Sequence, residues 1–232
     1  MNGLIAEDFL LENATAVRLY QDHAQDLPII DYHCHLPPEQ IAADHRFPNL
    51  AAIWLHGDHY KWRAMRANGI PERCITGDAP DREKFQAWAG TVPYTLRNPL
   101  HHWTHMELKR PFGIADRLLN PETAQGIWDH CNALLARKEF SCRGLLRQMK
   151  VVLVATTDDP ADSLAPHARI AADPSFPVQV LPAFRPDQGL AVEDPERFNA
   201  WVDRLEQASG IEIRDFDAYL EALRARRDYF HE

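Results

Sequence analysis

The feature that most constrains the fold is a continuous apolar run, Val151–Ala155, made of valine, leucine and alanine. Such a run is typical of a β-strand that is covered on both faces, as in a parallel sheet. Helical spacing follows at 163–172, and then a second short apolar stretch at 178–182. Two further helices are expected at about 195–208 and 215–230. Strand, helix, strand and helix in succession predict a parallel α/β unit.

A first strand is expected closer to the amino terminus. The pattern predicts three strands, near 28–35, 150–156 and 178–185, and a mostly helical segment at about 39–149. A parallel sheet has to be covered, and a (β/α)8 barrel needs eight strands in ~250 residues or more. By this arithmetic the sequence contains too few strands for a closed domain.

Composition excludes several classes of protein. The formal net charge is −9, with no stripe rich in lysine or arginine, so no nucleic-acid partner is expected. No apolar run approaches the ~20 residues that span a bilayer, so no membrane partner is expected either. The amino terminus lacks a secretory pattern, and the four scattered cysteines form no C-x-x-C pair. We therefore expect a cytoplasmic protein with free thiols.

Two histidines close the first predicted strand. On a strand, His33 and His35 would project from the same face with Cα atoms ~6.6 Å apart, and Asp31 would share that face. Both imidazoles can then bind one divalent ion at ~2.1 Å. Active sites of barrels of this type lie at the carboxyl ends of the strands. His33 and His35 are the predicted metal ligands, and the alternative is two polar residues in a strand-to-loop turn.

Other polar groups are candidates for a ligand site. His59 and Tyr60, within the segment G-D-H-Y-K-W-R, can donate to, or move protons among, the hydroxyl groups of a sugar. On the residues alone, an amphipathic helix with solvated charges is the favoured alternative. Arg185 follows the third predicted strand, and its planar guanidinium suits bidentate binding of a carboxylate. Arginine is also common in such loops without any role in binding.

Two polar clusters favour a structural interpretation. Asp158 and Asp159 end the second predicted strand, but Asp-Asp-Pro is an ordinary turn at the start of a helix. His101 and His105 have helical spacing, yet no glutamate follows the first of them, so they do not match H-E-x-x-H. A packed, hydrogen-bonded segment around His101, His102 and His105 is favoured over a second metal site.

A series of segments resembles the signatures of uronate isomerases, in the same order along essentially the whole chain. The segments are Asp31–Leu36, Ile53–Arg66, Ile75–Asp78, Phe85–Trp88, Pro93–Pro99, His102–His105, Glu107–Gly113 and Thr156–Pro160. The resemblance implies an aldose–ketose isomerase that interconverts D-glucuronate with D-fructuronate, and D-galacturonate with D-tagaturonate, through a metal-assisted enediol. The expected partner is therefore a small hexuronate, and a homo-oligomer is left open.

The resemblance also implies a fold and a set of site residues. The fold would be α/β, the amino-terminal part of a distorted TIM barrel of the amidohydrolase superfamily, with a large helical insertion after the first strand. Its H-x-H pair binds a divalent metal, usually zinc, and matches His33 and His35. The catalytic and substrate-binding His-Tyr pair matches His59 and Tyr60, and Arg185 matches an arginine that binds the substrate carboxylate.

Family chains are roughly twice as long as these 232 residues, and their proton-transferring aspartate lies in the second half. We therefore interpret the sequence as an amino-terminal fragment that is inactive alone, with its general base outside the chain. One alternative is a metal-dependent hydrolase of the same superfamily, which shares the H-x-H pair. The other is a non-catalytic remnant that binds a ligand or a partner.

Overall fold

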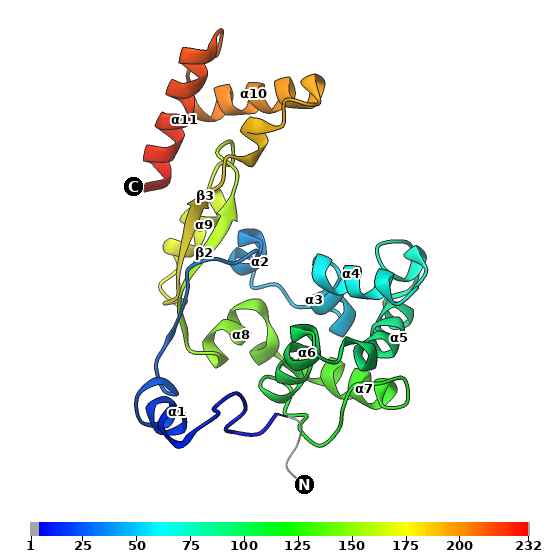
Figure 1. The fold of residues 1–232 in the computed structure, drawn as a ribbon. Coiled ribbons are helices and arrows are strands. Elements are labelled where there is room, and N and C mark those ends of the chain that lie inside the picture. Colours follow the sequence, from blue (N-terminus) through cyan, green and yellow to red (C-terminus); the bar gives the residue numbers. More distant parts are fainter. Residues whose placement is uncertain (1–4, 232) are drawn as a thin grey trace. The chain divides into compact units, whose positions relative to one another are not determined.

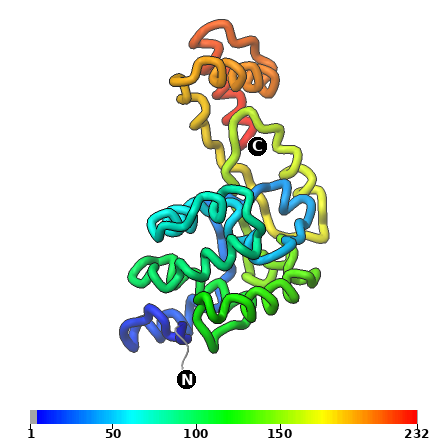
Figure 2. Tube along the Cα trace, turned by 90° about the vertical axis from the view of Figure 1, so that its right-hand side faces the viewer, coloured from blue at the N-terminus to red at the C-terminus, as the bar shows by residue number. Residues whose placement is uncertain are grey.

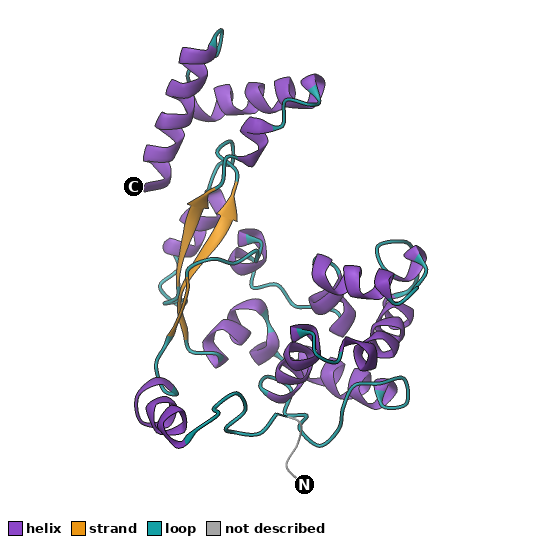
Figure 3. Ribbon diagram, viewed as in Figure 1, coloured by secondary structure: helices purple, strands orange, loops and turns teal. Residues whose placement is uncertain are grey.

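The protein, described here from a computed structural model over residues 5–231, divides into two compact units. The helical unit runs up to Leu27 and continues over His45–Gln148. The sheet unit consists of Pro28–Asp44 and the residues from Met149 onward. Among the described residues, strands occur only in the sheet unit (Figure 3). Each unit is treated by itself below.

The sheet unit contains a three-stranded parallel sheet in the order β1 (Ile29–Asp31), β2 (Val151–Asp158) and β3 (Gln179–Phe184). Helix α9 (Ala165–Ala171) connects β2 to β3 and packs against β3, while α2 (Pro38–Ala42) packs against α9 (Figure 1). The predicted parallel arrangement of three strands with a helical crossover is confirmed.

One face of this sheet is covered better than the other. Val154 and its register partner Val180 are buried on the same face. On the opposite face Leu153 and Ala155 are only half-buried, and Leu181 is 48% exposed. The prediction that β2 is covered on both faces is therefore wrong for the described residues, because Val152 is 44% exposed and Leu153 and Ala155 are only half-buried, although Val151 is buried.

The first strand is shorter than predicted. It ends at Asp31, so the predicted range 28–35 is wrong beyond that residue. The backbone N–H of Cys34 still donates to the oxygen of Ala155 at 2.9 Å, but the Cys34 oxygen accepts from the hydroxyl of Thr157 at 2.7 Å. A side chain thus takes the place of the next ladder partner, and the chain leaves the sheet as a loop.

Helices build the other unit, and Figure 2 traces the chain through them. They are α1 (Ala14–Leu19), α3 (Leu50–Leu55), α4 (His59–Ala67), α5 (Asp81–Thr91), α6 (Pro99–Lys109), α7 (Ala124–Leu135) and α8 (Cys142–Gln148). A π-helical turn, Tyr20–Ala24, extends α1, and 3-10 turns occupy Glu72–Cys74, Val92–Thr95 and Lys138–Phe140. The core contains the fully buried rings of Phe85 and Trp88. All described elements between β1 and β2 are helical, while the boundaries 39–149 stay a prediction.

Capping side chains decide where several of these helices begin. Helical spacing over 53–68 predicts a single helix there. This prediction is wrong, because the carboxylate of Asp58 accepts from the backbone amides of Tyr60 and Lys61 and starts a new helix. Ser141 precedes a stretch of helical spacing, which predicts an N-cap at this residue. The structure confirms it, since the Ser141 hydroxyl accepts from the amide of Gly144 at 3.2 Å.

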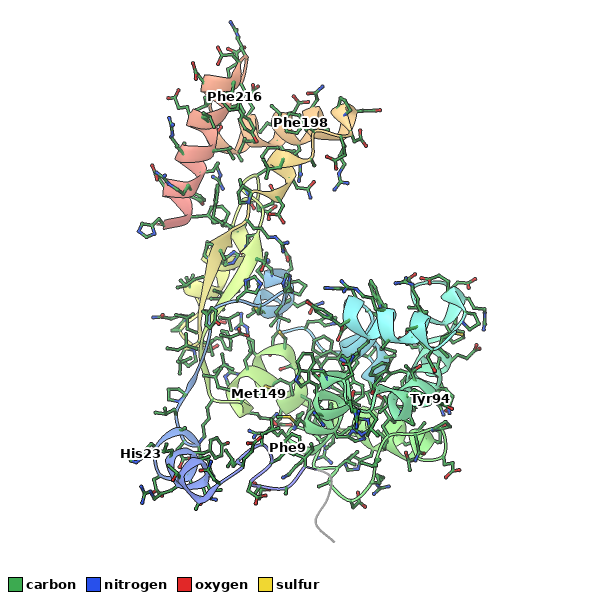
Figure 4. All side chains as sticks on the ribbon, in the orientation of Figure 1. Phe9, His23, Tyr94, Met149, Phe198 and Phe216 are labelled. Atoms are coloured by element: carbon green, nitrogen blue, oxygen red, sulfur yellow. The ribbon has the colours of Figure 1, made fainter. Side chains whose placement is uncertain are left out.

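Helices α10 (Pro195–Ser209) and α11 (Phe216–His231) follow β3 and confirm the two helices predicted there. They pack on each other through a small core around Trp201, to which Phe198 of α10 contributes; Figure 4 labels Phe198. Gly210 ends α10 at a φ of 70°, a left-handed conformation that suits glycine.

None of the helices within residues 5–231 combines the length and apolar character of a bilayer-spanning segment. The four cysteines carry free thiols, as predicted: Cys131 and Cys142 are buried, and Cys34 and Cys74 are half-buried.

Candidate functional site

The candidate site lies where the three parallel strands of the sheet unit end. His33 and His35 follow β1, Asp158 ends β2, and Arg185 follows β3. The ends of β2 and β3 are in register, and the backbone N–H of Arg185 donates to the oxygen of Asp158 at 3.0 Å. The structure therefore places most of the predicted site residues along one edge of the sheet, the edge where parallel α/β proteins bind ligands.

The two histidines after β1 converge. The Nε2 atoms of His33 and His35 lie 3.2 Å apart, and their ring planes meet at 82°. Two nitrogens bound to one tetrahedral ion at ~2.1 Å would be separated by about 3.4 Å. The pair therefore has the geometry of two ligands of one divalent ion. The predicted convergence is present, but a loop produces it, because β1 ends before either histidine.

No third ligand joins this pair among the residues that the structure describes. No group of three or more histidine, cysteine, aspartate or glutamate side chains in residues 5–231 is arranged to hold a metal ion. Asp31, which was expected on the same face, does not complete such a group. This part of the chain thus supplies two nitrogen donors.

A pocket of about 360 Å³ opens beside His35. Its lining comes entirely from the sheet unit: His35, Leu36, Pro37, Pro38, Glu39, Thr157, Asp158, Asp162, Ser163, Leu164, Pro166 and His167. Among the lining residues, Asp158 is only 5% exposed, and its Oδ2 accepts from the hydroxyl of Thr156 at 2.7 Å. Burial raises the pKa of the neighbouring Asp162.

The turn predicted at Asp-Asp-Pro is present, with the amide of Ala161 donating to Asp159 Oδ1 at 2.9 Å, but the prediction that it starts a helix is wrong. Asp158 is buried at the end of β2, and Asp159 accepts from the indole N–H of Trp201 at 2.8 Å. The next helix, α9, begins only at Ala165. Asp159 therefore joins the end of β2 to α10, while Asp158 belongs to the edge where the ligand residues lie.

His167 lines the pocket but is not among the residues that the sequence pattern singles out. The residue is only 7% exposed. Burial lowers the pKa of its imidazole, although the negative charge of Asp158 acts to raise it. Its Nε2 lies 2.8 Å from the Thr156 hydroxyl oxygen. Because that hydroxyl gives its single proton to Asp158, Nε2 must donate to Thr156, and Nδ1 carries the free lone pair. A lone histidine inside a helix carries no sequence signal of this network.

Arg185 is accessible to a ligand. Its side chain is 49% exposed, and its Nε donates to Asp187 at 2.6 Å. An ion pair as exposed as this contributes little free energy. A ligand carboxylate can therefore compete with Asp187 for the guanidinium group.

His59 and Tyr60 are the first two residues of α4, in the helical unit. Both side chains are exposed, and their ring centroids lie 4.3 Å apart at an interplanar angle of 31°. The alternative of a helix with solvated charges is wrong for Lys61, which is only 5% exposed. The predicted site residues thus form two pairs, His33 with His35 in the sheet unit and His59 with Tyr60 in the helical unit. Arg185 lies on the same edge of the sheet as the first pair.

The histidines of α6 have a packing role, as predicted. His105 is 4% exposed, its Nδ1 lies 2.6 Å from the oxygen of His101, and its Nε2 accepts from the amide of Leu119 at 3.0 Å. His101 is buried as well, with Nδ1 3.2 Å from the oxygen of Val92. Both nitrogens of His105 are therefore committed in the neutral ring.

Acid should destabilise the fold through His105. Burial lowers the pKa of His105 in the folded protein below 6.5, its ordinary value in the unfolded chain. At a pH between the folded and unfolded pKa values, the unfolded chain therefore binds more protons than the folded one. The free energy of unfolding should therefore fall as pH drops below about 6.5, by at most about 1.4 kcal/mol per pH unit from this residue. Urea unfolding at pH 7.5 and 5.5 measures the loss, which His105→Gln should reduce. An equal loss in wild type and variant would contradict this assignment.

A family model, a related sequence and two solved structures that resemble this chain all carry the name of uronate or glucuronate isomerase. Residues 1–232 match the family model for glucuronate isomerase. A uronate isomerase of Cellvibrio japonicus (strain Ueda107) is 57% identical over 230 residues, which are 99% of this chain and 49% of that protein. Crystal structures of a uronate isomerase from Thermotoga maritima and a glucuronate isomerase from Caulobacter crescentus superpose with TM-scores of 0.90 and 0.88, at 34% and 28% identity. Each comparison covers 98% of this chain and 49% of that structure, so the chain spans about half the length of these relatives.

Proposed function

Because the chain belongs to the glucuronate isomerase family, we propose that its residues form part of a metal-dependent enzyme that interconverts the aldose and ketose forms of hexuronates. The substrates would be D-glucuronate and D-galacturonate, and the products D-fructuronate and D-tagaturonate. The observation that carries the proposal is the convergence of His33 and His35 at the carboxyl end of β1. The activity is proposed for a protein of the relatives' length that contains these residues.

The fold proposed for that protein is a distorted (β/α)8 barrel. Three parallel strands in sequential order, with the α9 crossover between β2 and β3, are the beginning of such a barrel. The half-open face around Leu181 supports this proposal, since parallel sheets are normally covered on both faces. The exclusively helical elements described between β1 and β2 support a helical insertion after the first strand.

His33 and His35 would hold the divalent ion, and zinc suits imidazole nitrogens. When bound, the ion would supply positive charge that stabilises the negative charge developing on a substrate oxygen. Both side chains are exposed, and their Nε2 atoms have a separation that fits one ion. The role of these two residues is thus to place that charge at the carboxyl edge of the sheet.

The remaining residues would orient the sugar acid and handle its protons. Isomerisation moves a proton from C2 to C1 through an enediol, so hydroxyl groups at both carbons need hydrogen-bond partners. His59 and Tyr60 carry groups that donate and accept, and both are exposed. Arg185 would bind the C6 carboxylate, so that binding energy distant from the reacting carbons orients them. The base that takes the C2 proton is assigned to none of the described residues.

The test is direct. The full-length protein, supplied with zinc, is given D-glucuronate or D-galacturonate in D2O, and the products are followed by NMR. Formation of the matching ketose, with deuterium at the transferred position, supports an isomerase that works through an enediol. Hydrolysis of a lactone or amide without aldose–ketose conversion would instead support a hydrolase.

Removing the guanidinium of Arg185 should mainly weaken substrate binding. A charge-assisted hydrogen-bonded pair contributes about 1.5–3 kcal/mol, so Arg185→Met should raise KM by about 10- to 100-fold. Arg197→Met is the matched control, because Arg197 is an exposed arginine of the same unit that donates to Gln188 at 3.0 Å. Steady-state kinetics measures both variants. Equal KM values for Arg185→Met and the wild type would remove Arg185 from the site.

A further inference from the structure

The placement of His59 and Tyr60 depends on how helix α4 begins. The Oδ1 atom of Asp58 accepts from the backbone amides of Tyr60 and Lys61 at 2.9 and 3.1 Å. This cap fixes the first turn of α4, and the first turn contains both site residues. Whatever holds the Asp58 carboxylate therefore also holds His59 and Tyr60.

Lys61 holds that carboxylate from inside the helical unit. Its Nζ donates to Asp58 Oδ2 at 2.8 Å, so the two oxygens of Asp58 have different partners. Lys61 is 5% exposed, and its ammonium lies 5.7 Å from the ring centre of Trp54. A buried charge is costly unless it is paired, which makes this placement sensitive to the groups around the ammonium.

Glu107 of α6 supplies a second carboxylate to the same ammonium. Its Oε2 lies 3.6 Å from Lys61 Nζ, a distance for an ion pair rather than a hydrogen bond. The side chain is 38% exposed as a whole, yet Oε2 itself is buried and has no hydrogen-bond partner among the described residues. Lys61 thus lies between a carboxylate at the start of α4 and another on α6.

The two carboxylates respond differently to this environment. Burial raises the pKa of Glu107 against the opposing charge of Lys61. Burial also acts to raise the pKa of Asp58, but the charge and hydrogen bond of Lys61, together with two backbone amides, lower it overall. Lys61 is therefore bound more strongly by Asp58, and Glu107 acts as the weaker second anchor on another helix.

We propose that Lys61 and Glu107 are positioning residues for His59 and Tyr60. Through Asp58 they fix where α4 begins and tie this point to α6, without touching the substrate. The inference rests on the proposed function of His59 and Tyr60. It adds a reason why a lysine follows that pair directly and why its ammonium is buried.

A purely structural role would give a different result, and the same helix offers a control. Near the other end of α4, Arg66 forms an ion pair with Glu72, with Nη2–Oε1 and Nε–Oε2 distances of 2.5 and 2.8 Å. Glu72→Gln removes an ion pair of α4 that lies away from its first turn. If ion pairs matter only for the stability of α4, Glu72→Gln and Glu107→Gln should affect turnover alike.

The experiment compares Lys61→Met, Glu107→Gln and Glu72→Gln in the full-length protein, with steady-state kinetics and circular dichroism. Displacing a reacting group by about 1 Å can cost 10²-fold, so Lys61→Met should lower kcat by about 10- to 100-fold and Glu107→Gln by less. KM should change less than kcat, and Glu72→Gln should leave both unchanged. Glu107→Asp, which keeps the charge, should recover part of the loss.

Asp58→Ser keeps the experiment decisive if a charge variant does not fold. Serine retains a capping oxygen for the amides of Tyr60 and Lys61 but offers no carboxylate to the ammonium. A folded Asp58→Ser protein with lowered kcat supports the proposal, and wild-type kcat in that variant overturns it.

The outcomes also separate the two proposals. In one outcome, the wild type turns over a hexuronate and His59→Gln does not, but folded Lys61→Met and Glu107→Gln keep the wild-type kcat. That outcome would overturn this inference and leave the proposed function intact. No hexuronate turnover by the wild type would overturn the proposed function, and the positioning role would fall with it.

Discussion

Replacing either His33 or His35 with asparagine in the full-length protein should lower turnover of a hexuronate by about 10³-fold or more. Each supplies one of the two nitrogens that lie 3.2 Å apart at the end of β1. Loss of a ligand weakens metal binding, and metal charge stabilises a transition state by several kcal/mol, with each 1.36 kcal/mol worth tenfold in rate. Bound zinc per protein, measured by elemental analysis, should fall together with kcat.

His23→Asn is the control, because His23 is an exposed histidine in the π-helical turn of the helical unit (Figure 4). Unchanged zinc content and turnover in both His33→Asn and His35→Asn would contradict the assigned ligands. The 232-residue chain alone should bind zinc weakly and show no turnover, because its described residues supply only this pair. Turnover by that polypeptide would show that its own residues suffice.

Replacing Gly144 with alanine should destabilise the helical unit by about 3 kcal/mol or more, which is in the range of severe overpacking. An added Cβ would overlap the carbonyl oxygen of Glu139 and lie 2.7 Å from its carbonyl carbon. It would also lie 3.0 Å from the oxygen of Lys138. All three atoms belong to the backbone, so no side-chain rotation relieves the overlap. Urea unfolding followed by circular dichroism measures the loss.

Gly90→Ala provides the opposite result in the same unit. Gly90 lies in α5, and an added Cβ there meets nothing within 4 Å. Alanine is a better helix former than glycine, so this variant should gain roughly 0.5–1 kcal/mol. A Gly144→Ala protein as stable as the wild type would show that the turn at Glu139 can move away.

Local signals predicted most of the elements. The apolar run Val151–Ala155 predicts β2 because short runs rich in valine are typical of strands. The helical spacing and the second apolar stretch that follow it predict α9 and β3. Ser141 was identified as an N-cap because a hydroxyl before a helix satisfies free amides. These signals depend only on residues that are close in the sequence, so the sequence alone was sufficient to place these elements.

Signals that depend on distant residues were missed. After β1 ends at Asp31, the oxygen of Cys34 accepts from the hydroxyl of Thr157, and no feature near Asp31 in the sequence reveals this contact. The burial of Lys61 depends on Glu107, far along the chain, so helical periodicity alone suggested a solvated charge. The break before Asp58 was predictable, since aspartate before a helix is a capping signal.

The histidine pair was found for a reason that the structure corrects. Strand alternation would place both rings on one face, whereas a loop brings the rings of His33 and His35 together. The barrel, the zinc ion, the cytoplasmic location and a homo-oligomer stay predictions.

The sheet unit is discontinuous along the chain, and this affects the route by which it forms. Ile29 of β1 pairs with Val151 of β2, so the pairing must close a loop that holds most of the helical unit. The entropy cost of closing a flexible loop rises with the logarithm of its length. Inside the helical unit, however, the amide of Cys142 donates to the oxygen of His45 at 2.8 Å, which brings together two points of that loop that are far apart in the sequence. Folding of the helices first therefore turns a long-range search into a nearly local one, and a chain leaving the ribosome can assemble them before β2 is available to β1.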